Sequence, residues 1–322
     1  MSADKSILVT GGAGFIGSHL VERLLRDGHR VVVVDDLSTG NRENLASVAG
    51  NPRLKIIEAK VSACVALPRL VRESVAIFHL AAAVGVDLVV KSPIHVLKNN
   101  IHETETLLEA AAVANVPTII ASTSEVYGKS EKTEFSEDDD LLIGPPQHSR
   151  WGYACSKLMD EFIAFAYAQE RALPIVIARL FNTVGPRQTG QFGMVLPRFI
   201  AAAKKNEPLR VFGDGQQSRC FCYVLDAVEA MVRLWQTPEA RGQILNVGNT
   251  EEVTILELAK QVIATLNARS TVEFIPYDKA YASGFDDMRR RKPQVEKLER
   301  LIQFRPQTPL REIIERTAAA MD

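Results

Sequence analysis

A tyrosine and a lysine four positions apart are the residues of this chain best suited to moving a proton. Tyr153 and Lys157 lie in the amphipathic stretch 151–171, so a helix would place both side chains on one face, one turn apart. A free phenol ionises near about pH 10, and a neighbouring ammonium or a positive nicotinamide ring favours the phenolate. Tyr153 is therefore a candidate general base for a substrate hydroxyl whose carbon loses hydride. Thr123, at the end of a predicted strand, could share a hydrogen bond with that hydroxyl.

A glycine-rich turn near the start of the chain predicts the partner that accepts such a hydride. The apolar run 7–9 has the length of a buried parallel strand, and a helical pattern follows the turn. The turn carries three regularly spaced glycines, Gly11, Gly14 and Gly17. Glycine lets the backbone approach a pyrophosphate, and the N-terminus of the helix attracts that anion. This pattern indicates a dinucleotide-binding βαβ unit.

Two acidic residues at the end of the next apolar run select the dinucleotide. The run 31–34 ends in Asp35 and Asp36. A carboxylate at this position accepts both ribose hydroxyls and repels a 2′-phosphate, which favours NAD over NADP.

The remaining elements must hold these residues together at one edge of a sheet. Strands are predicted at 54–59, 75–80, 118–121 and 175–180, and they alternate with helices at 93–114 and 151–171. This alternation predicts an α/β fold, a doubly wound parallel sheet of the Rossmann type, over residues 1–180. Residues 181–322 are expected to form mainly a smaller α/β substrate-binding lobe, with the segment 213–250 returning to the first domain. The polar, acidic loop 129–149 is longer than a simple connection needs, which suggests a functional excursion.

Bulk composition excludes several classes of function. The chain has 322 residues, 46% hydrophobic and 24% charged, and a formal net charge of −1, which gives no global attraction to nucleic acid. Neither a signal peptide nor a membrane-spanning run is expected. The four cysteines, Cys64, Cys155, Cys220 and Cys222, show no zinc spacing, so no metal site and a cytoplasmic location are predicted.

Motifs across nearly the whole chain resemble one superfamily. They are TGGAGFIGSHL (10–20), HLAA (79–82), Asn100, STSEVYG (122–128), Tyr153-x-x-x-Lys157, RLFNTVGPRQ (179–188), GDGQQSRCFCYVLD (213–226) and NVGN (246–249). Together they resemble the extended short-chain dehydrogenase/reductase superfamily of NAD-dependent nucleotide-sugar epimerases, dehydratases and decarboxylases.

The resemblance implies roles for further residues. Beside the glycines, the acids and Tyr153 and Lys157, it implies that the cofactor is bound by Phe15, Ile16, Leu80, Ala81, Ala82, Asn100 and Ser122. It implies that the diphosphate and sugar of a nucleotide-sugar substrate are bound by Arg150, Asn182, Arg187, Val211, Gln217, Arg219 and Arg291. It further implies a homodimer through a four-helix bundle, formed by helices 93–114 and 151–171 with the apolar residues Ala110, Ala111, Ala112, Phe162, Phe165 and Ala166.

Three cues favour one reaction within this superfamily. Its members share oxidation of the sugar at C4, and Glu125 occupies a position at which dehydratases and uronate decarboxylases, unlike simple 4-epimerases, carry glutamate. The stretches Arg150-Trp151-x-Tyr153 and Arg291-Lys292-Pro293 also resemble decarboxylases. In that reading Arg291 or Arg150 orients a substrate carboxylate, and Glu125 is the acid/base near C5. UDP-glucuronate decarboxylation is therefore the first prediction.

Other readings stay open. A UDP-sugar 4-epimerase, acting on UDP-glucose or UDP-glucuronate, is the second, and an NDP-hexose 4,6-dehydratase the third. A non-catalytic NAD-binding sensor on the same fold belongs to a different class. The chain also departs from the family pattern at Lys60-Val61, at Glu103 and at Val86-Asp87; the first bears on the adenine contacts and the third on the substrate.

Overall fold

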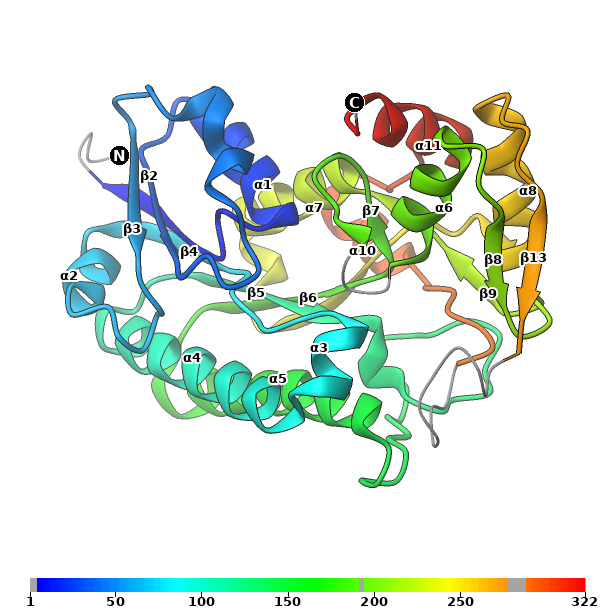
Figure 1. The fold of residues 1–322 in the computed structure, drawn as a ribbon. Helices are drawn as coiled ribbons and strands as arrows, with labels where there is room; N and C mark the ends of the chain where they lie inside the picture. Colours follow the sequence, from blue (N-terminus) through cyan, green and yellow to red (C-terminus); the bar gives the residue numbers. More distant parts are fainter. Residues whose placement is uncertain (1–4, 191–193, 277–287, 322) are drawn as a thin grey trace.

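A parallel β-sheet forms the centre of the molecule (Figure 1). The computed structural model describes residues 5–190, 194–276 and 288–321. The sheet has seven strands in the order β11-β6-β5-β4-β1-β2-β3, and every neighbouring pair is parallel. Its strands are β1 (Ser6–Thr10), β2 (Val31–Asp35), β3 (Leu54–Glu58), β4 (Ser74–His79), β5 (Thr118–Thr123), β6 (Ile175–Leu180) and β11 (Gln243–Val247). From β1 the chain adds β2 and β3 toward one edge of the sheet, and from β4 it adds β5 and β6 toward the other edge. Open α/β sheets bind ligands at such a point, here between β1 and β4.

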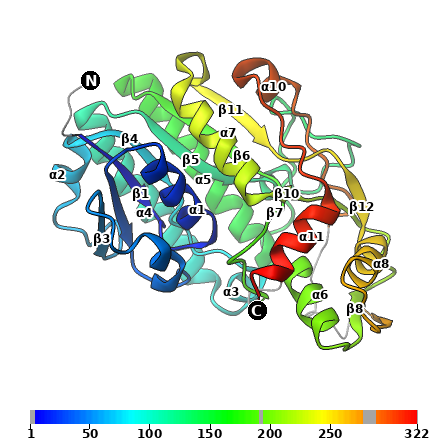
Figure 2. The ribbon, with the colours of Figure 1, turned by 90° about the horizontal axis from the view of Figure 1, so that it is seen from above.

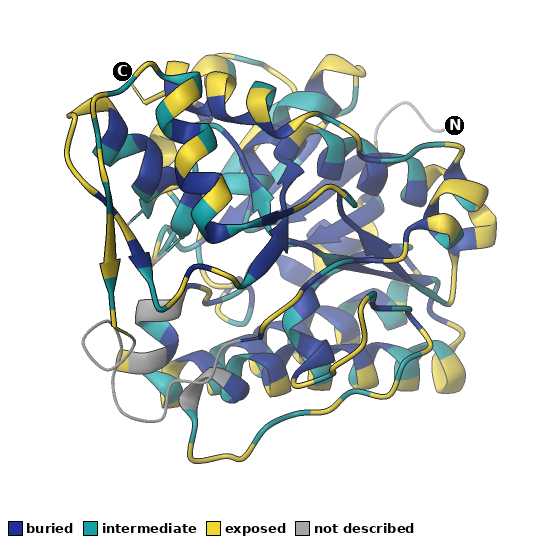
Figure 3. Cartoon of the chain, turned by 90° about the vertical axis from the view of Figure 1, so that its right-hand side faces the viewer, coloured by how far each residue is buried: buried dark blue, intermediate teal, exposed yellow. Residues whose placement is uncertain are grey.

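Helices cover both faces of this sheet. One face carries η1 (Arg42–Val48), α1 (Phe15–Arg26), α7 (Val224–Gln236) and α10 (Glu296–Ile302). The other carries α2 (Leu67–Arg72), α4 (Pro93–Ala114) and α5 (Ser149–Arg171). Figure 1 shows α4 and α5 side by side along the lower face. The inner strands of the sheet are buried, the edge strand β3 is partly exposed, and the outer helix faces are exposed, as Figure 3 shows. The predicted doubly wound α/β class is confirmed.

A smaller lobe lies beside the carboxyl end of the sheet (Figure 2). Its helices are α6 (Val195–Lys204), α8 (Ile255–Thr265) and α11 (Leu310–Ala319). Its strands form three short pairs: β7 (Thr183–Val184) with β10 (Cys222–Tyr223), β8 (Leu209–Phe212) with β13 (Val272–Ile275), and β9 (Ser218–Cys220) with β12 (Glu252–Thr254). The lobe has its own apolar core, built around residues such as Phe199, Leu209 and Leu258. Within the described residues the chain returns from the lobe to the main domain twice, first for α7 and strand β11 and later for α10.

Some short elements are not predicted by the sequence pattern; the first two named here follow the carboxyl ends of β4 and β5, and the third precedes the amino end of β11. They are α3 (Val86–Lys91), η2 (Ser124–Tyr127) and η4 (Pro238–Ala240). The segment 192–205 has a helical sequence pattern; residues 192 and 193 lie outside the described residues, and helix α6 begins at Val195. None of the described helices is both long and apolar enough to cross a membrane. All four cysteines are free thiols.

Candidate active site

The glycine turn after β1 forms a cradle with room for an anion. Gly11 has a φ of +71°, and a Cβ there would lie 2.6 Å from the Ala81 backbone nitrogen. A Cβ on Gly17 would overlap the Gly11 carbonyl oxygen. Gly14 is the N-cap of α1 and offers no side-chain cap, so the first amides of the helix stay available. These features fit a dinucleotide pyrophosphate bound at the N-terminus of α1.

The two acids at the end of β2 lie next to this turn. Asp35 is buried, and its carboxylate accepts hydrogen bonds from the backbone nitrogens of Ala13 at 2.8 Å and Leu37 at 2.9 Å. Burial raises the pKa of Asp35. Asp36 accepts from the backbone nitrogen of Ser38 at 3.0 Å. Each carboxylate keeps lone pairs that can accept ribose hydroxyls, so both fit the adenosine side of the cofactor.

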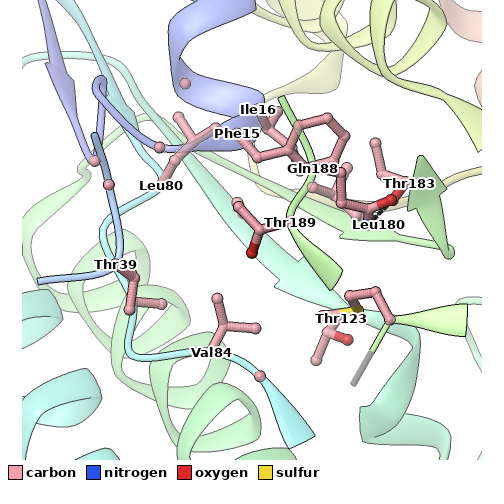
Figure 4. A pocket seen from close by; sticks show the side chains of 18 of the residues that line it. Phe15, Ile16, Thr39, Leu80, Val84, Thr123, Leu180, Thr183, Gln188 and Thr189 are labelled. Atoms are coloured by element: carbon pink, nitrogen blue, oxygen red, sulfur yellow. Dashed lines mark hydrogen bonds between the residues drawn. The ribbon is translucent and has the colours of Figure 1, made fainter. Parts of the chain in front are cut away.

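A single cavity of about 550 Å³ extends from this cradle across the carboxyl ends of β4, β5 and β6. Figure 4 shows Leu80 beside Phe15 and Ile16 of α1, with Val84 and Thr123 on the opposite side. Thr183, Gln188 and Thr189 come from the chain that follows β6. The predicted cofactor residues that line the cavity are Gly11, Gly14, Phe15, Ile16, Gly17, Asp35, Asp36, Leu80, Ala81, Ala82, Ser122, Tyr153 and Lys157.

Asn100 differs from the expectation for a cofactor ligand. It is buried behind the cavity wall and does not line it. Its amide bonds both backbone groups of Ala83, at 2.7 and 3.3 Å, and donates to the Ser156 hydroxyl at 3.1 Å. Asn100 therefore fixes the turn after β4 against α5 and shapes the cavity indirectly.

Tyr153 and Lys157 both line the cavity from the first turns of α5. Burial raises the pKa of Tyr153, the carboxylates of Glu125 and Asp160 raise it further, and a hydrogen bond with Thr123 lowers it. Lys157, which was expected to lower this pKa, is not among the groups that shift it. The reason is local, because the Lys157 ammonium is held by Asp160 at 2.7 Å.

Glu125 and Arg291 meet on the wall of the same cavity. They form an ion pair with side-chain exposures of 17% and 10%. Glu125 lies in η2, directly after β5, and its backbone nitrogen donates to the Thr123 hydroxyl at 3.2 Å.

The acidic excursion 129–149 brings Arg291 to this place. The Phe135 nitrogen donates to the Lys292 carbonyl at 2.8 Å, and the Gln294 nitrogen donates to the Phe135 carbonyl at 2.9 Å. The Phe135 ring stacks on Tyr127 at 4.7 Å, which ties this bridge to η2. The long loop therefore connects two chain segments that carry opposite charges into the site.

The predicted substrate residues divide into three groups. Asn182, Arg187, Gln217, Arg219 and Arg291 line the cavity. Val211 does not, because strand alternation buries its side chain in the core of the lobe and turns its neighbours Arg210 and Phe212 toward the cavity. The side chain of Arg150 lies outside the described residues.

Arg187 and Arg219, like Arg291, already have partners within the protein. Arg187 donates to the Ser18 hydroxyl at 3.1 Å and pairs with Glu22, both on α1, so it joins the loop after β7 to the dinucleotide unit. Arg219 donates to the Ser218 carbonyl at 2.7 Å. Of the three departures from the family pattern, Lys60 and Glu103 line the adenosine side of the cavity, whereas the side chains of Val86 and Asp87 lie outside the described residues.

Sequence reasoning missed a buried ion pair that supports the site. Arg179 of β6 forms two hydrogen bonds to the Glu161 carboxylate, at 3.0 and 2.7 Å, and both side chains are buried. A charged residue within the apolar run IVIARL was the available signal, because a buried arginine needs a partner. No cluster of histidine, cysteine or acidic residues that could hold a metal ion occurs in the described parts of the chain.

The fold and the site define a class of protein. A Rossmann sheet with a glycine turn, an acid after β2 and a Tyr-x-x-x-Lys helix beside the same cavity is the arrangement of a short-chain dehydrogenase/reductase. Residues 7–248 match the NAD dependent epimerase/dehydratase family, and the chain belongs to this family. The predicted family and the predicted cofactor, NAD, are thereby confirmed.

Individual relatives narrow the comparison. Over 303 residues the chain is 40% identical to the UDP-N-acetyl-alpha-D-glucosaminuronate decarboxylase of Bacillus cytotoxicus, covering 94% of this chain and 93% of that protein. It is 34% identical to UDP-glucuronic acid decarboxylase 1 of Danio rerio, covering 97% of this chain and 72% of that protein. A solved structure of UDP-glucuronic acid 4-epimerase from Bacillus cereus, in complex with UDP-glucuronic acid and NAD, superposes with a TM-score of 0.86 at 31% identity over 98% of both chains. These relatives are enzymes, which supports the enzyme reading over the sensor.

Proposed function

We propose that this chain decarboxylates a UDP-linked hexuronate after oxidising its sugar at C4. The observation that carries the proposal is the Glu125–Arg291 ion pair on the wall of the cavity that also holds Tyr153. An arginine fork binds carboxylates in a fixed orientation, and the substrate of this reaction carries one. The named activities of the two decarboxylase relatives agree with this assignment.

In the first step the chain's own residues remove a proton. The Tyr153 oxygen takes the proton of the C4 hydroxyl, and Thr123, already hydrogen-bonded to Tyr153, keeps that oxygen oriented. NAD, when bound, supplies the acceptor for the hydride of C4 and the donor that returns it. The product of this step is a ketone at C4, β to the C6 carboxylate.

In the second step the C5–C6 bond breaks and its electron pair flows to the C4 ketone, so that CO₂ leaves. The arriving carboxylate competes with Glu125 for the Arg291 guanidinium. Once displaced from Arg291, the Glu125 carboxylate can take up a proton from water and deliver it to C5. Asn182, Gln217 and Arg219 would hold the diphosphate and the nearby sugar from the smaller lobe.

Product analysis tests the proposal. The NAD-loaded protein is incubated with UDP-glucuronate and, separately, with UDP-N-acetylglucosaminuronate, while CO₂ and the nucleotide products are followed. We expect CO₂ and a UDP-linked pentose, or its 2-acetamido counterpart, from at least one of them. No CO₂ from either substrate would contradict the proposal.

A 4-epimerase is the second candidate, favoured by the similarity to the solved UDP-glucuronic acid 4-epimerase. In that case the uronate would be recovered intact with an inverted C4. If neither uronate reacts, release of water from a dTDP-hexose would support the third reading, a 4,6-dehydratase.

We also propose that the protein is a homodimer in the cytoplasm. On α5, Cys155, Met159, Phe162 and Ala166 are exposed at helical spacing, and Ile94 and Val113 are exposed on the adjacent α4. Phe162 is 65% exposed, which leaves apolar surface that a second copy could cover. Of the other residues expected at this interface, Ala111 is buried within the monomer and Phe165 packs against the same core. Four free thiols are consistent with a reducing compartment.

A further inference from the structure

A buried chain of polar side chains lies behind the Tyr153–Lys157 pair and has no role in the proposed reaction. It begins at Asp160, one turn beyond Lys157 on α5. The Lys157 ammonium and the Asp160 carboxylate are 2.7 Å apart, with side-chain exposures of 3% and 0%. The second carboxylate oxygen of Asp160 is buried and accepts no hydrogen bond. A buried carboxylate in this setting serves mainly to bind the ammonium.

This series of polar side chains continues across the sheet to the glycine turn. The Thr104 hydroxyl of α4 lies beside Asp160 and is 3.0 Å from His79 Nε2. His79 Nδ1 is 2.7 Å from the hydroxyl of Thr10, the last residue of β1. Burial, and secondarily the charge of Lys157, lowers the pKa of His79 to about 3, so this ring is neutral. The charged members of this series of polar side chains are therefore Lys157 and Asp160.

The other charged groups on the elements packed around this part of the cavity are held by partners of their own. Glu161 of α5 is bound by Arg179 of β6, and Glu125 of η2 is bound by Arg291. On α4, the Glu103 carboxylate accepts hydrogen bonds from the backbone nitrogen and hydroxyl of Ser62. Substitution of Asp160 therefore changes one pair of charges, leaving the Lys157 ammonium without its carboxylate while the Glu161–Arg179 and Glu125–Arg291 pairs stay intact.

We propose that Asp160 is a positioning residue that anchors the Lys157 ammonium and offsets its charge, so that the Tyr153 phenol ionises only when a further positive charge enters the pocket. This inference rests on the proposed function, in which that positive charge is the oxidised nicotinamide. Tyr153 would then be a base when the cofactor can accept hydride and an acid when it can donate hydride. The burial of both partners and the 2.7 Å contact carry the argument, and the raised pKa of Tyr153, to which burial, Glu125 and Asp160 contribute in that order, agrees with it.

The test reads the phenol directly and needs no substrate. The protein is labelled with carbon-13 at the ζ carbon of its six tyrosines, and the Tyr153 signal is assigned by its loss in Tyr153→Phe. Its pH titration is followed with NAD⁺ bound and with NADH bound. We expect ionisation at a pH lower by about one unit or more with NAD⁺ than with NADH. Equal titrations in the two forms would overturn the proposal, whatever reaction the enzyme catalyses.

Substitution of Asp160 tests the residue itself. Asp160→Asn keeps the shape of the side chain and removes its charge. In the NADH-bound form we therefore expect Tyr153 to titrate at a lower pH than in the wild type. The acidic limb of the pH profile of kcat should move in the same direction. Asp160→Glu, which keeps the charge, should restore the wild-type profile, and Asp27→Asn, an exposed partner of Arg23 on α1, should leave it unchanged. A uniform loss of activity in Asp160→Asn with unshifted titration would show a merely structural role. If Asp160→Asn does not fold, the comparison of NAD⁺ and NADH in the wild-type protein can still overturn the proposal, since equal titrations contradict it, and Asp160→Glu then tests the residue.

Discussion

Arg291 and Glu125 show how single residues prepare the site for an anion. Their ion pair lies on the cavity wall, partly shielded from water, where a charge-assisted hydrogen bond is stronger than at the surface. A uronate carboxylate that binds Arg291 takes the place of Glu125, so the guanidinium is paired with a carboxylate both before and after the substrate binds.

Replacing Arg291 therefore affects uronates in particular. For Arg291→Met we expect kcat/KM for the UDP-uronate to fall by about 10- to 100-fold, the cost of one charge-assisted hydrogen bond. Steady-state CO₂ release measures this. The neighbouring Arg290→Met is the matched control, since Arg290 is half-exposed and pairs with Glu252 outside the cavity. Equal losses in the two variants would rule out the assigned role.

At the scale of elements, the turn between β1 and α1 depends on glycine for space. The positions differ in what a side chain would meet: at Gly17 a Cβ would overlap the Gly11 carbonyl, whereas at Gly50 nothing lies within 4 Å. Gly17→Ala must displace the turn that receives the pyrophosphate, so we expect NAD affinity to fall at least about tenfold, or about 1.4 kcal/mol. Calorimetric titration with NAD tests this. Gly50→Ala should bind NAD as the wild type does, and an unchanged affinity in Gly17→Ala would contradict the placement of the pyrophosphate.

Helix α5 carries the catalytic pair and is tied to β6 by a buried ion pair. Removing one partner, as in Glu161→Ala, leaves Arg179 charged and buried, so we expect the free energy of unfolding to fall by about 3–5 kcal/mol. Glu315→Ala breaks the exposed pair with Arg311 on α11, and it should cost at most about 0.5 kcal/mol. Urea denaturation compares the two variants. Similar small losses in both would mean that the buried pair contributes no more than a surface pair.

At the scale of the whole molecule, α4 and α5 leave an apolar strip facing outward while their other faces pack on the sheet. If a second copy covers this strip, Phe162→Glu should shift the protein to monomers, because a charge would be buried at the centre of the interface. Sedimentation over a range of concentrations tests this. Phe274→Glu, on β13 of the smaller lobe, is the control, since Phe274 is also exposed, at 51%. A monomeric wild-type protein would contradict the dimer.

The sequence predicts the parts of this molecule that follow from local rules. Alternating apolar runs and helical periodicities indicate the parallel sheet, and the glycine spacing indicates the cradle at α1. Contacts between distant segments are not local, so the sequence does not reveal that Phe135 bridges to residues 292–294 and thereby brings Arg291 to Glu125.

Two residues expected to line the cavity lie elsewhere for the same reason. Asn100 and Val211 sit in motifs near the cavity, but side-chain direction decides whether a residue faces a ligand, and both face inward. The effect of Lys157 on Tyr153 depends on Asp160, three residues further along the helix, whose buried position no spacing rule gives.

The central claim is that the Tyr153 phenol initiates the reaction by taking the C4 hydroxyl proton. The most direct measurement is the rate of CO₂ release from the UDP-uronate by NAD-loaded wild-type protein and by Tyr153→Phe, with NAD binding confirmed in both. The account predicts that the variant binds NAD but releases CO₂ at least about 100-fold more slowly, which is the range of general-base catalysis. Release of CO₂ by Tyr153→Phe at a rate close to that of the wild type would contradict it.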